Sequence, residues 1–480
     1  MIHGESSGWY ATYKATATLK VERAPSAIYC NDMSIEKKLR VAIIGGGIAG
    51  LTFAICLAKN NANVDVDIYE SGPEFSTNGA GLGMWPRIWA IMKELGLEEE
   101  LRRRSTALTG DDRPFMYCKA DQAKGHVFAQ SMSTMEPYHR AEFLQILCEN
   151  APKQLNKNFG KKLDHYVDNP PDPIIMHFRD GTTASCDILV GADGVKSAVR
   201  RTMYNHLADK APDREAAEAL RREGSATWTG QVAYRHLISA DELRKSCPDH
   251  PGLRQPIIFS GENRYLICYP ISQGRIVNCA ALVSQPQFAG TLYEGPSVSM
   301  TSQEELLVLY KNWEPRAQAV LDLMVTPSKW VINSVESLPT FVAGRVAILG
   351  DAAHAMTPHQ ASGAGQAVED AMVLSMLLAQ RELGRKTAPI ALQVYDEVRR
   401  PFTQSVVRGS LQTGKNYYFQ SPLAQEMLRE LAKTGAMPTE LLNKIGDETA
   451  EQLRWTWSTT IKGDQDYAVE MFKTRVAQRG

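Results

Sequence analysis

A glycine-rich turn near residue 45 has the residue types and the spacing needed to bind a phosphate group. A short apolar run from Leu39, typical of a buried parallel strand, leads into Gly45-Gly-Gly-Ile-Ala-Gly50. Gly45 suits a tight turn, Gly47 lets a pyrophosphate approach the backbone, and Gly50 lets the next helix pack closely on the strand. The N-terminus of that helix favours an anion. Glu70 follows at the distance where a carboxylate can bind ribose hydroxyls, so the pattern predicts a dinucleotide site.

The elements that must position these residues form a βαβ unit. Apolar spacing predicts a strand over 39–45 and an amphipathic helix over 51–60, and alternation predicts a second strand over 64–70. This unit alone does not distinguish NAD from FAD. Two later turns bear on that choice: Gly191-Ala-Asp193-Gly194 follows an expected strand over 183–190, and Gly350-Asp351 follows one over 345–349.

The ordered set of motifs resembles the class A flavoprotein aromatic hydroxylases, the group of salicylate hydroxylase and 4-hydroxybenzoate hydroxylase. The resemblance extends from Leu39 to about Pro401 and includes Glu369-Asp-Ala371 and a Tyr395-to-Pro401 segment. It implies bound FAD and a transient NADPH or NADH co-substrate, which fits the lack of a second glycine fingerprint. The choice between NADH and NADPH stays open.

The resemblance also implies roles for individual residues. Glu70 would hold the adenosine ribose, Arg140 would lie along the ribityl and phosphate chain, and Asp351 would accept a hydrogen bond from the ribityl chain. Gly83 and Ala364 match positions where the backbone approaches the flavin, and a larger side chain there would collide with the cofactor. The expected cofactor-binding residues are Gly45, Gly47, Gly50, Glu70, Gly83, Arg140, Asp193, Asp351, Gly363 and Ala364.

On the substrate side, Arg235 and Tyr269 are the expected catalytic residues. Strand alternation places Arg235 on the face opposite Tyr234 and His236. A cation near a phenol lowers its pKa and favours the more nucleophilic phenolate. The pair is similar to one that acts on the substrate phenol in fungal family members that dearomatise resorcinol-type aldehydes. The alternatives are an arginine paired to a carboxylate and a tyrosine packed in the sheet.

Two histidines near the Gly350-Asp351 turn invite an acid–base interpretation. In the family the histidine matching His354 is largely structural, and we expect the same here. For His359, which follows Pro358, a structural and a catalytic role are equally open.

Length and composition set the broad class. The 480 residues carry 53 Lys+Arg and 54 Asp+Glu, so a net charge of -1 gives no reason to expect nucleic acid or an anionic membrane as partner. The 8 cysteines are scattered without a CxxC pair, which predicts reduced thiols and no metal site. No apolar run approaches the roughly 20 residues needed to span a bilayer. We expect a cytoplasmic monomer or homodimer.

The expected fold class is α/β. It comprises a Rossmann-like FAD-binding domain with a parallel sheet, an inserted substrate domain with an antiparallel sheet, and a helical C-terminal region. The expected boundaries are an N-terminal extension over 1–38, an FAD-binding domain over 39–110, 135–210 and 336–400, a substrate domain over 111–134 and 211–335, and a helical region over 401–480.

These features predict an FAD-dependent monooxygenase that hydroxylates a small phenolic substrate with NAD(P)H and O2. The resemblance implies oxygen transfer from a flavin C4a-hydroperoxide, with decarboxylation or dearomatisation as alternative outcomes. Two other functions are considered: an NAD-dependent dehydrogenase built on the first βαβ unit, and a non-catalytic FAD-binding redox sensor or partner protein.

Overall fold

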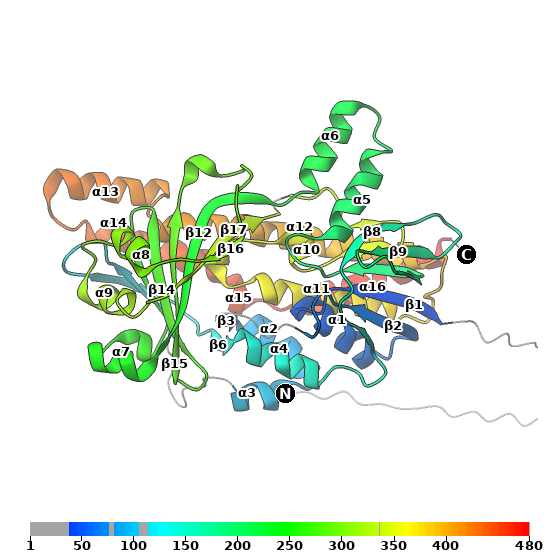
Figure 1. Cartoon of the computed structure of the whole chain (residues 1–480), viewed down its shortest axis with the longest axis horizontal. Coiled ribbons are helices and arrows are strands. Elements are labelled where there is room, and N and C mark those ends of the chain that lie inside the picture. The colour runs from blue at the N-terminus through cyan, green and yellow to red at the C-terminus, as the bar shows by residue number, and fades with distance from the viewer. Residues whose placement is uncertain (1–37, 76–80, 105–113, 336, 480) are drawn as a thin grey trace, which may run out of the picture. The chain divides into compact units, whose positions relative to one another are not determined.

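The first strand lies inside a six-stranded sheet in the computed structural model (Figure 1). The structure describes residues 38–75, 81–104, 114–335 and 337–479, so the extension expected over 1–38 lies, apart from Lys38, outside the described residues. All pairs in the sheet are parallel except β18 with β19. Its order is β18 (Val342–Ala343), β19 (Val346–Ile348), β11 (Ile188–Gly191), β1 (Leu39–Ile44), β2 (Val64–Tyr69) and β7 (Asn156–Asn158).

Three turns leave the same edge of this sheet. The strands β1, β11 and β19 are parallel neighbours, so the turns after Ile44, Gly191 and Ile348 meet at their carboxyl ends. The carboxyl edge of an open parallel sheet is where such folds bind ligands. The topology therefore brings together the three motifs that are far apart in the sequence.

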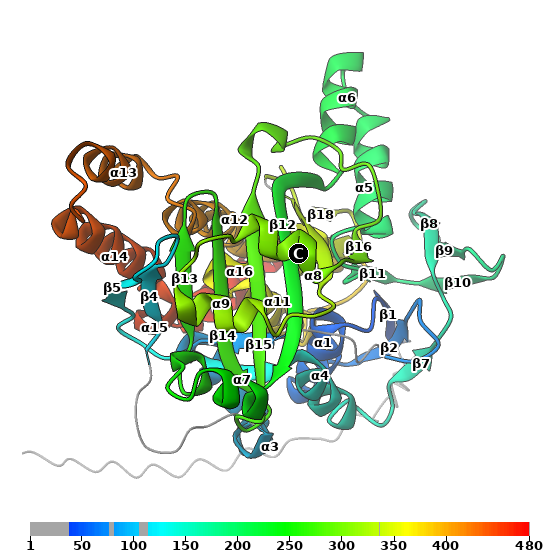
Figure 2. The ribbon, with the colours of Figure 1, turned by 60° about the vertical axis from the view of Figure 1, so that its left-hand side comes forward.

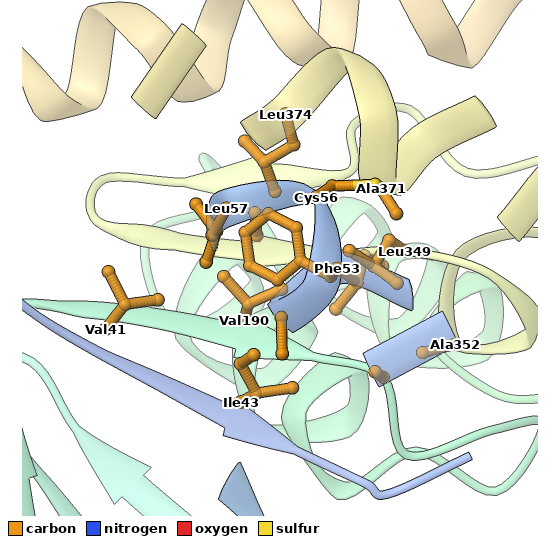
Figure 3. Packing of buried hydrophobic residues seen from close by; sticks show 14 of the residues in the cluster. Val41, Ile43, Phe53, Cys56, Leu57, Val190, Leu349, Ala352, Ala371 and Leu374 are labelled. Atoms are coloured by element: carbon orange, nitrogen blue, oxygen red, sulfur yellow. The ribbon is translucent and has the colours of Figure 1, made fainter. Parts of the chain in front are cut away.

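Two helices bury one face of the parallel sheet. Helix α1 (Ile48–Lys59) packs between the sheet and helix α11 (Gly363–Leu378). Figure 3 shows Phe53 of α1 at the centre of this cluster, with Val190 of β11 below it and Leu374 of α11 above it. Because α1 begins directly at the glycine turn, its N-terminus faces whatever the turn binds.

The second large sheet has eight strands, and most of its pairs are antiparallel, as the sequence predicts. The only parallel pair in this sheet joins β4 to β13. Figure 2 shows its four long central strands side by side. The order is β16 (Val298–Met300), β17 (Ser328–Ser334), β12 (Thr227–Ser239), β15 (Ile276–Ser284), β14 (Arg264–Ile271), β13 (Ile257–Gly261), β4 (Met116–Lys119) and β5 (His126–Gln130).

One face of the eight-stranded sheet packs against three short helices, α7 (Ala240–Ser246), α8 (Gln303–Leu309) and α9 (Pro315–Leu321). Helices α8 and α9 are separated by residues 310–314, which are not helical. The expected strand over 183–190 is interrupted, since β10 (Thr183–Cys186) joins a small antiparallel sheet and β11 joins the parallel one. The break falls at Asp187, whose carboxylate accepts a hydrogen bond from the Arg40 amide.

The long helix α12 (Ala388–Tyr417) contains Pro401 in its interior. The boundary expected at residue 401 therefore falls within one helix. The boundary expected at 211 lies between α5 (Ala198–Ala208) and α6 (Arg214–Glu223), which pack together. No helix among the described residues combines the length and apolar composition that crossing a bilayer requires. The remaining helices and strands are α2 (Pro86–Glu94), α3 (Glu98–Arg104), α4 (Arg140–Glu149), α10 (Asp351–His354), α13 (Pro422–Thr434), α14 (Thr439–Leu453), α15 (Trp455–Ser458), α16 (Lys462–Ala477), β3 (Gly81–Met84), β6 (Glu136–His139), β8 (Leu163–Val167) and β9 (Ile174–Phe178).

Candidate active site

A cavity of about 380 Å³ lies between the carboxyl edge of the parallel sheet and one face of the eight-stranded sheet. Its volume is in the range of small-molecule sites. The side of the parallel sheet contributes the start of α1, the turn after β11 and the segment from Asp351 to Ala364. The expected site residues that line it are Gly83, Arg140, Arg235, Tyr269, Asp351, Gly363 and Ala364, whereas Gly45, Gly47, Gly50, Glu70 and Asp193 are outside the lining.

The three glycines of the first turn are required for different reasons. Gly45 has φ +107°, and a Cβ there would lie 2.4 Å from the Ala192 carbonyl oxygen. A Cβ on Gly50 would lie 2.1 Å from the Gly45 carbonyl oxygen, so that glycine lets α1 pack on the turn. A Cβ on Gly47 would meet no described atom within 4 Å. Gly47 also caps α1 without any side-chain hydrogen bond, so the open space and the free helix N–H groups fit a phosphate.

Glu70 follows the end of β2, beside this turn. One carboxylate oxygen accepts a hydrogen bond from the Gly46 amide at 2.8 Å, and the other accepts from the Gly72 amide at 2.7 Å and from the Ser71 hydroxyl at 2.9 Å. A carboxylate has about four acceptor positions. Glu70 therefore fixes the glycine turn and keeps capacity for a ribose hydroxyl.

The side chain of Asp193 does not face the cavity. Its carboxylate accepts hydrogen bonds from the Ser197 hydroxyl and from the Ala198 amide at the N-terminus of α5. Burial raises the pKa of Asp193, although these hydrogen bonds lower it. In the structure this carboxylate caps α5 and shapes the turn, while the neighbouring Ala192 and Gly194 line the cavity.

Arg200 connects two of the three turns, a role that the sequence motif alone does not reveal. Its guanidinium donates to the carbonyl oxygen of Val195 at 2.6 Å, after β11, and to that of Ala352 at 2.7 Å, after β19. A third hydrogen bond reaches Gly224 at 2.9 Å. Three carbonyls arranged around a rigid fork hold the two turns at a fixed separation.

Gly83 lines the cavity, but its lack of a side chain has a different cause from the one expected. A Cβ there would lie 1.7 Å from the Met135 sulphur, so Met135 fills the space that a side chain at position 83 would need. Gly81, two residues earlier in β3, similarly leaves room for the ring of Tyr269, whose hydroxyl oxygen would lie 2.2 Å from a Cβ. The Gly81 amide donates to Asn278 at 2.9 Å, which ties β3 to the eight-stranded sheet.

Asp351, Gly363, Ala364 and Arg140 together fit the polar chain of a dinucleotide. Asp351 begins α10 and is exposed to the cavity. Gly363 and Ala364 begin α11, whose first turn carries no side-chain cap. Arg140 begins α4 on another side of the cavity. The Asp351 carboxylate can accept hydrogen bonds from the ribityl hydroxyls of FAD. The free N-terminus of α11 suits the flavin ring, and the Arg140 guanidinium suits a phosphate.

Arg235 enters the cavity from β12. Strand alternation holds as expected: Tyr234, on the other face, donates to Glu305 at 2.7 Å, while Arg235 lies over the ring of Trp330 with 5.1 Å to its centroid. No carboxylate among the described residues forms an ion pair with the Arg235 guanidinium, so the alternative of a paired arginine has no support there. Desolvation by burial lowers the pKa of Arg235, and Tyr269 raises it.

Tyr269 lies on β14 with its hydroxyl toward β3, and it is buried at the cavity surface. Burial raises the pKa of Tyr269, and the nearby Arg235 lowers it. The structure thus places the expected catalytic residues in the same cavity and within electrostatic reach of each other.

His359 is buried in the cavity lining between two polar partners. Its Nδ1 is 2.9 Å from the Tyr265 hydroxyl, and its Nε2 is 2.9 Å from Gln231 Oε1. Burial lowers the pKa of His359 to about 3, so the ring is neutral near pH 7. Accordingly Nδ1 accepts from Tyr265 and Nε2–H donates to Gln231, which leaves neither ring nitrogen free. This arrangement favours the structural role for His359.

His354 belongs to a buried polar cluster behind the cavity. Its Nε2 contacts the Asp370 carboxylate, which also accepts from the Gly350 amide at 3.1 Å and from Arg399 at 3.0 Å. The expected structural role agrees with this geometry. Asp370 and Arg399 thereby fix the turn that presents Asp351.

Metal chemistry has no support from the described part of the chain. No group of three or more His, Cys, Asp or Glu residues there could hold a metal ion. The seven described cysteines are all free, and most are buried.

Fold and site together define a flavin-dependent oxidoreductase with a Rossmann-type domain over a sheet-walled cavity. The chain matches the model of the FAD binding domain family over residues 38–243 and 318–410. It is 32% identical to an FAD-dependent monooxygenase of Strobilurus tenacellus, covering 92% of this chain and 100% of that protein. It is 31% identical to a salicylate hydroxylase of Pseudomonas putida, covering 90% and 95%. A solved salicylate hydroxylase substrate complex superposes with a TM-score of 0.75 at 27% identity, covering 90% and 98%.

The chain therefore belongs to the class A FAD-dependent aromatic monooxygenases. The predicted fold class, the FAD cofactor and the monooxygenase activity are confirmed. NAD(P)H is the co-substrate typical of this family. The alternative of a non-catalytic FAD-binding protein is not supported, because the named relatives are enzymes.

Proposed function

We propose that this enzyme hydroxylates a small phenol and that Arg235 binds the phenol as its anion, with Tyr269 as the second polar contact. One observation carries the proposal: the partly buried guanidinium of Arg235 lines the cavity and has no carboxylate partner among the described residues. Burying a charge without a partner is costly. An anionic ligand offsets that cost, and a phenolate oxygen supplies the charge and accepts a hydrogen bond.

The chain's own residues divide into two groups around the cavity. Gly47 and the α1 N-terminus would hold the pyrophosphate of FAD, Glu70 the ribose, and Asp351 with Arg140 the ribityl chain. Bound FAD supplies the redox chemistry, namely hydride acceptance from NAD(P)H and activation of O2. Arg235 favours the ionised phenol and thereby raises electron density at the ring carbons ortho and para to its oxygen.

The burial of the cavity wall keeps water away from the bound phenol. Tyr265, Ile258 and Tyr269 are all buried. In a water-poor site the attraction between a cation and a phenolate is stronger than in bulk water. The same wall excludes water that would otherwise compete for the activated oxygen.

Two outcomes are proposed for the oxidised ring, and the substrate decides between them. If the attacked carbon bears a carboxylate, as in the substrate that names the salicylate hydroxylases, CO2 leaves and the ring regains aromaticity. If that carbon bears an alkyl group, the ring stays dearomatised, which is the outcome that the Arg235 and Tyr269 pair favours.

The test uses the purified FAD-loaded enzyme with salicylate, simple phenols and alkyl resorcinols. Consumption of NADH and of NADPH is followed separately, and product masses are determined. Substrate-dependent NAD(P)H oxidation with a gain of one oxygen atom supports the proposal, and a loss of CO2 identifies the decarboxylating outcome. NAD(P)H oxidation that yields only hydrogen peroxide with every phenol contradicts it.

We also propose that the enzyme is cytoplasmic, that it is a monomer or a homodimer, and that its domains have the boundaries expected from the sequence. Light scattering of the purified enzyme measures the oligomeric state directly.

A further inference from the structure

One row of side chains crosses the eight-stranded sheet from Arg235 and becomes apolar. Arg235 on β12 lies opposite Ala280 on β15, and Ala280 lies opposite Ile267 on β14. Ile267 lies opposite Ile258 on β13, and Ile258 lies opposite Tyr117 on β4. All five residues line the cavity. Because neighbouring strands are about 4.8 Å apart, four steps take the row roughly 19 Å from the backbone of Arg235.

The far end of this row is closed by aromatic and aliphatic side chains. Tyr417 of α12 and Leu453 of α14 line the cavity there and belong to one buried cluster with Tyr117. The rings of Tyr117 and Tyr417 stack with 5.9 Å between centroids. Burial raises the pKa of the Tyr117 hydroxyl, and Tyr417 lowers it. The two tyrosines therefore close this end of the cavity with stacked aromatic rings.

Among the described residues that line the cavity, no charged side chain lies at this far end. The charged residues that line the cavity are Arg140, Arg235 and Asp351, and of these only Arg235 projects from the sheet. A carboxylate placed near Tyr117 would lose its hydration without gaining a partner. An apolar group there would instead be removed from water.

We propose that the substrate is a phenol with an extended apolar substituent, whose oxygen binds Arg235 and whose substituent lies along the row toward Tyr117. The inference rests on the proposed function, since it takes Arg235 as the phenol site. It adds the substrate class: the substituent is a hydrocarbon chain or ring of several carbons and carries no charge at its end.

A homologous series tests the substituent. The FAD-loaded enzyme is titrated with 4-alkylphenols and with 5-alkylresorcinols from methyl to pentyl, and Kd is measured from the change in the flavin absorbance. Each buried methylene should tighten binding about fourfold, which corresponds to about 0.8 kcal/mol. A pentylresorcinol whose chain ends in a carboxylate should bind more weakly than the methyl compound. A Kd that is flat or rises with chain length in both series would overturn the inference.

Two neighbouring isoleucines provide a matched pair of variants. Ile258 lines the cavity, whereas Ile257 on the same strand faces the opposite core. Ile258→Phe should shorten the apolar row, so the gain in affinity with chain length should stop at shorter chains than in the unchanged enzyme. Ile257→Phe adds the same bulk elsewhere and should leave the chain-length dependence unchanged. If a phenylalanine variant fails to fold, Ile258→Ala and Ile257→Ala replace the pair, and only Ile258→Ala should weaken pentyl binding.

The outcomes separate this inference from the proposed function. If short phenols are hydroxylated but longer chains bring no affinity, the phenol site stands and the apolar row is not a substrate site. If no phenol of either series binds or reacts, both proposals fail. Equal effects of the two isoleucine variants would also overturn the assignment of the row.

Discussion

Replacing Arg235 by methionine removes the one sheet-borne positive charge in the cavity and nearly preserves the volume of the side chain. Because Arg235 forms no ion pair with a described carboxylate, the substitution leaves no described anion uncompensated. A methionine side chain at position 235 can still pack against the Trp330 ring that Arg235 contacts. We therefore expect a folded, FAD-loaded protein whose defect is confined to the phenol.

The size of that defect follows from the contact that is lost. A hydrogen bond to a charged group contributes about 1.5–3 kcal/mol, so kcat/KM should fall about 10- to 150-fold near pH 7. A cation within about 4–6 Å lowers the pKa of an acid by about 1–3 units. Without Arg235 the bound phenol ionises at higher pH, so the rising limb of the kcat profile, which reports ionisations in the substrate complex, should move upward by that amount. Raising the pH should then recover part of the lost rate.

The assay measures kcat and kcat/KM from pH 6 to 10 by product formation, together with Kd for the phenol and the FAD content. Arg235→Lys keeps the charge and should shift the profile less than Arg235→Met does. His236→Met, on the opposite face, is the control for a substitution in the same strand. An Arg235→Met enzyme with bound FAD, unchanged kcat/KM and an unmoved profile would refute the role of this guanidinium.

Three further predictions concern the cofactor and the buried histidine. Gly47→Val should give a folded protein that retains little FAD in dialysis, since a side chain there meets open space in the protein. Gly50→Val should instead lower the free energy of unfolding, because its side chain would collide with the Gly45 carbonyl. Glu70→Gln should weaken FAD binding about tenfold, while Asp67→Asn on the preceding strand should not, as measured by fluorescence titration of the apoprotein. The pKa of His359 is about 3 in the folded protein, and its ordinary value is 6.5. Between these two pH values the unfolded chain binds one proton more than the folded protein. The free energy of unfolding therefore decreases as the pH falls, by up to about 1.4 kcal/mol per pH unit. Urea unfolding of His359→Gln between pH 5.5 and 4 should show a smaller slope, and an equal slope would contradict neutral burial.

The parts of the site encoded in consecutive residues could be predicted from the sequence. The glycine turn, the strand before it and the helix after it all depend on local geometry and apolar spacing, and Gly45 and Gly50 are glycines for the expected reasons. The alternation that points Arg235 away from Tyr234 is also local.

Parts that depend on tertiary packing could not be predicted. Asp193 has the motif position of a cofactor residue, yet its carboxylate caps α5. Gly83 is excluded from carrying a side chain by Met135, which is more than fifty residues away in the sequence. Pro401 suggests a helix end, but the packing of α12 carries the helix through it. For Gly83 a distant contact replaces the local signal, and for Asp193 the start of the next helix does so.

The neutral state of His359 has a consequence for how the cavity orients a substrate. A protonated histidine in the lining would offer a second cation to the phenolate, and the ring could then bind in two orientations. Its burial, with both nitrogens engaged by Tyr265 and Gln231, leaves Arg235 as the positive group of the sheet face. Under the proposed function, the Arg235 charge at one end of the sheet face and the apolar row toward Tyr117 at the other would bind a phenol in one direction. A neutral His359 would then contribute to regioselectivity without any proton transfer by that residue.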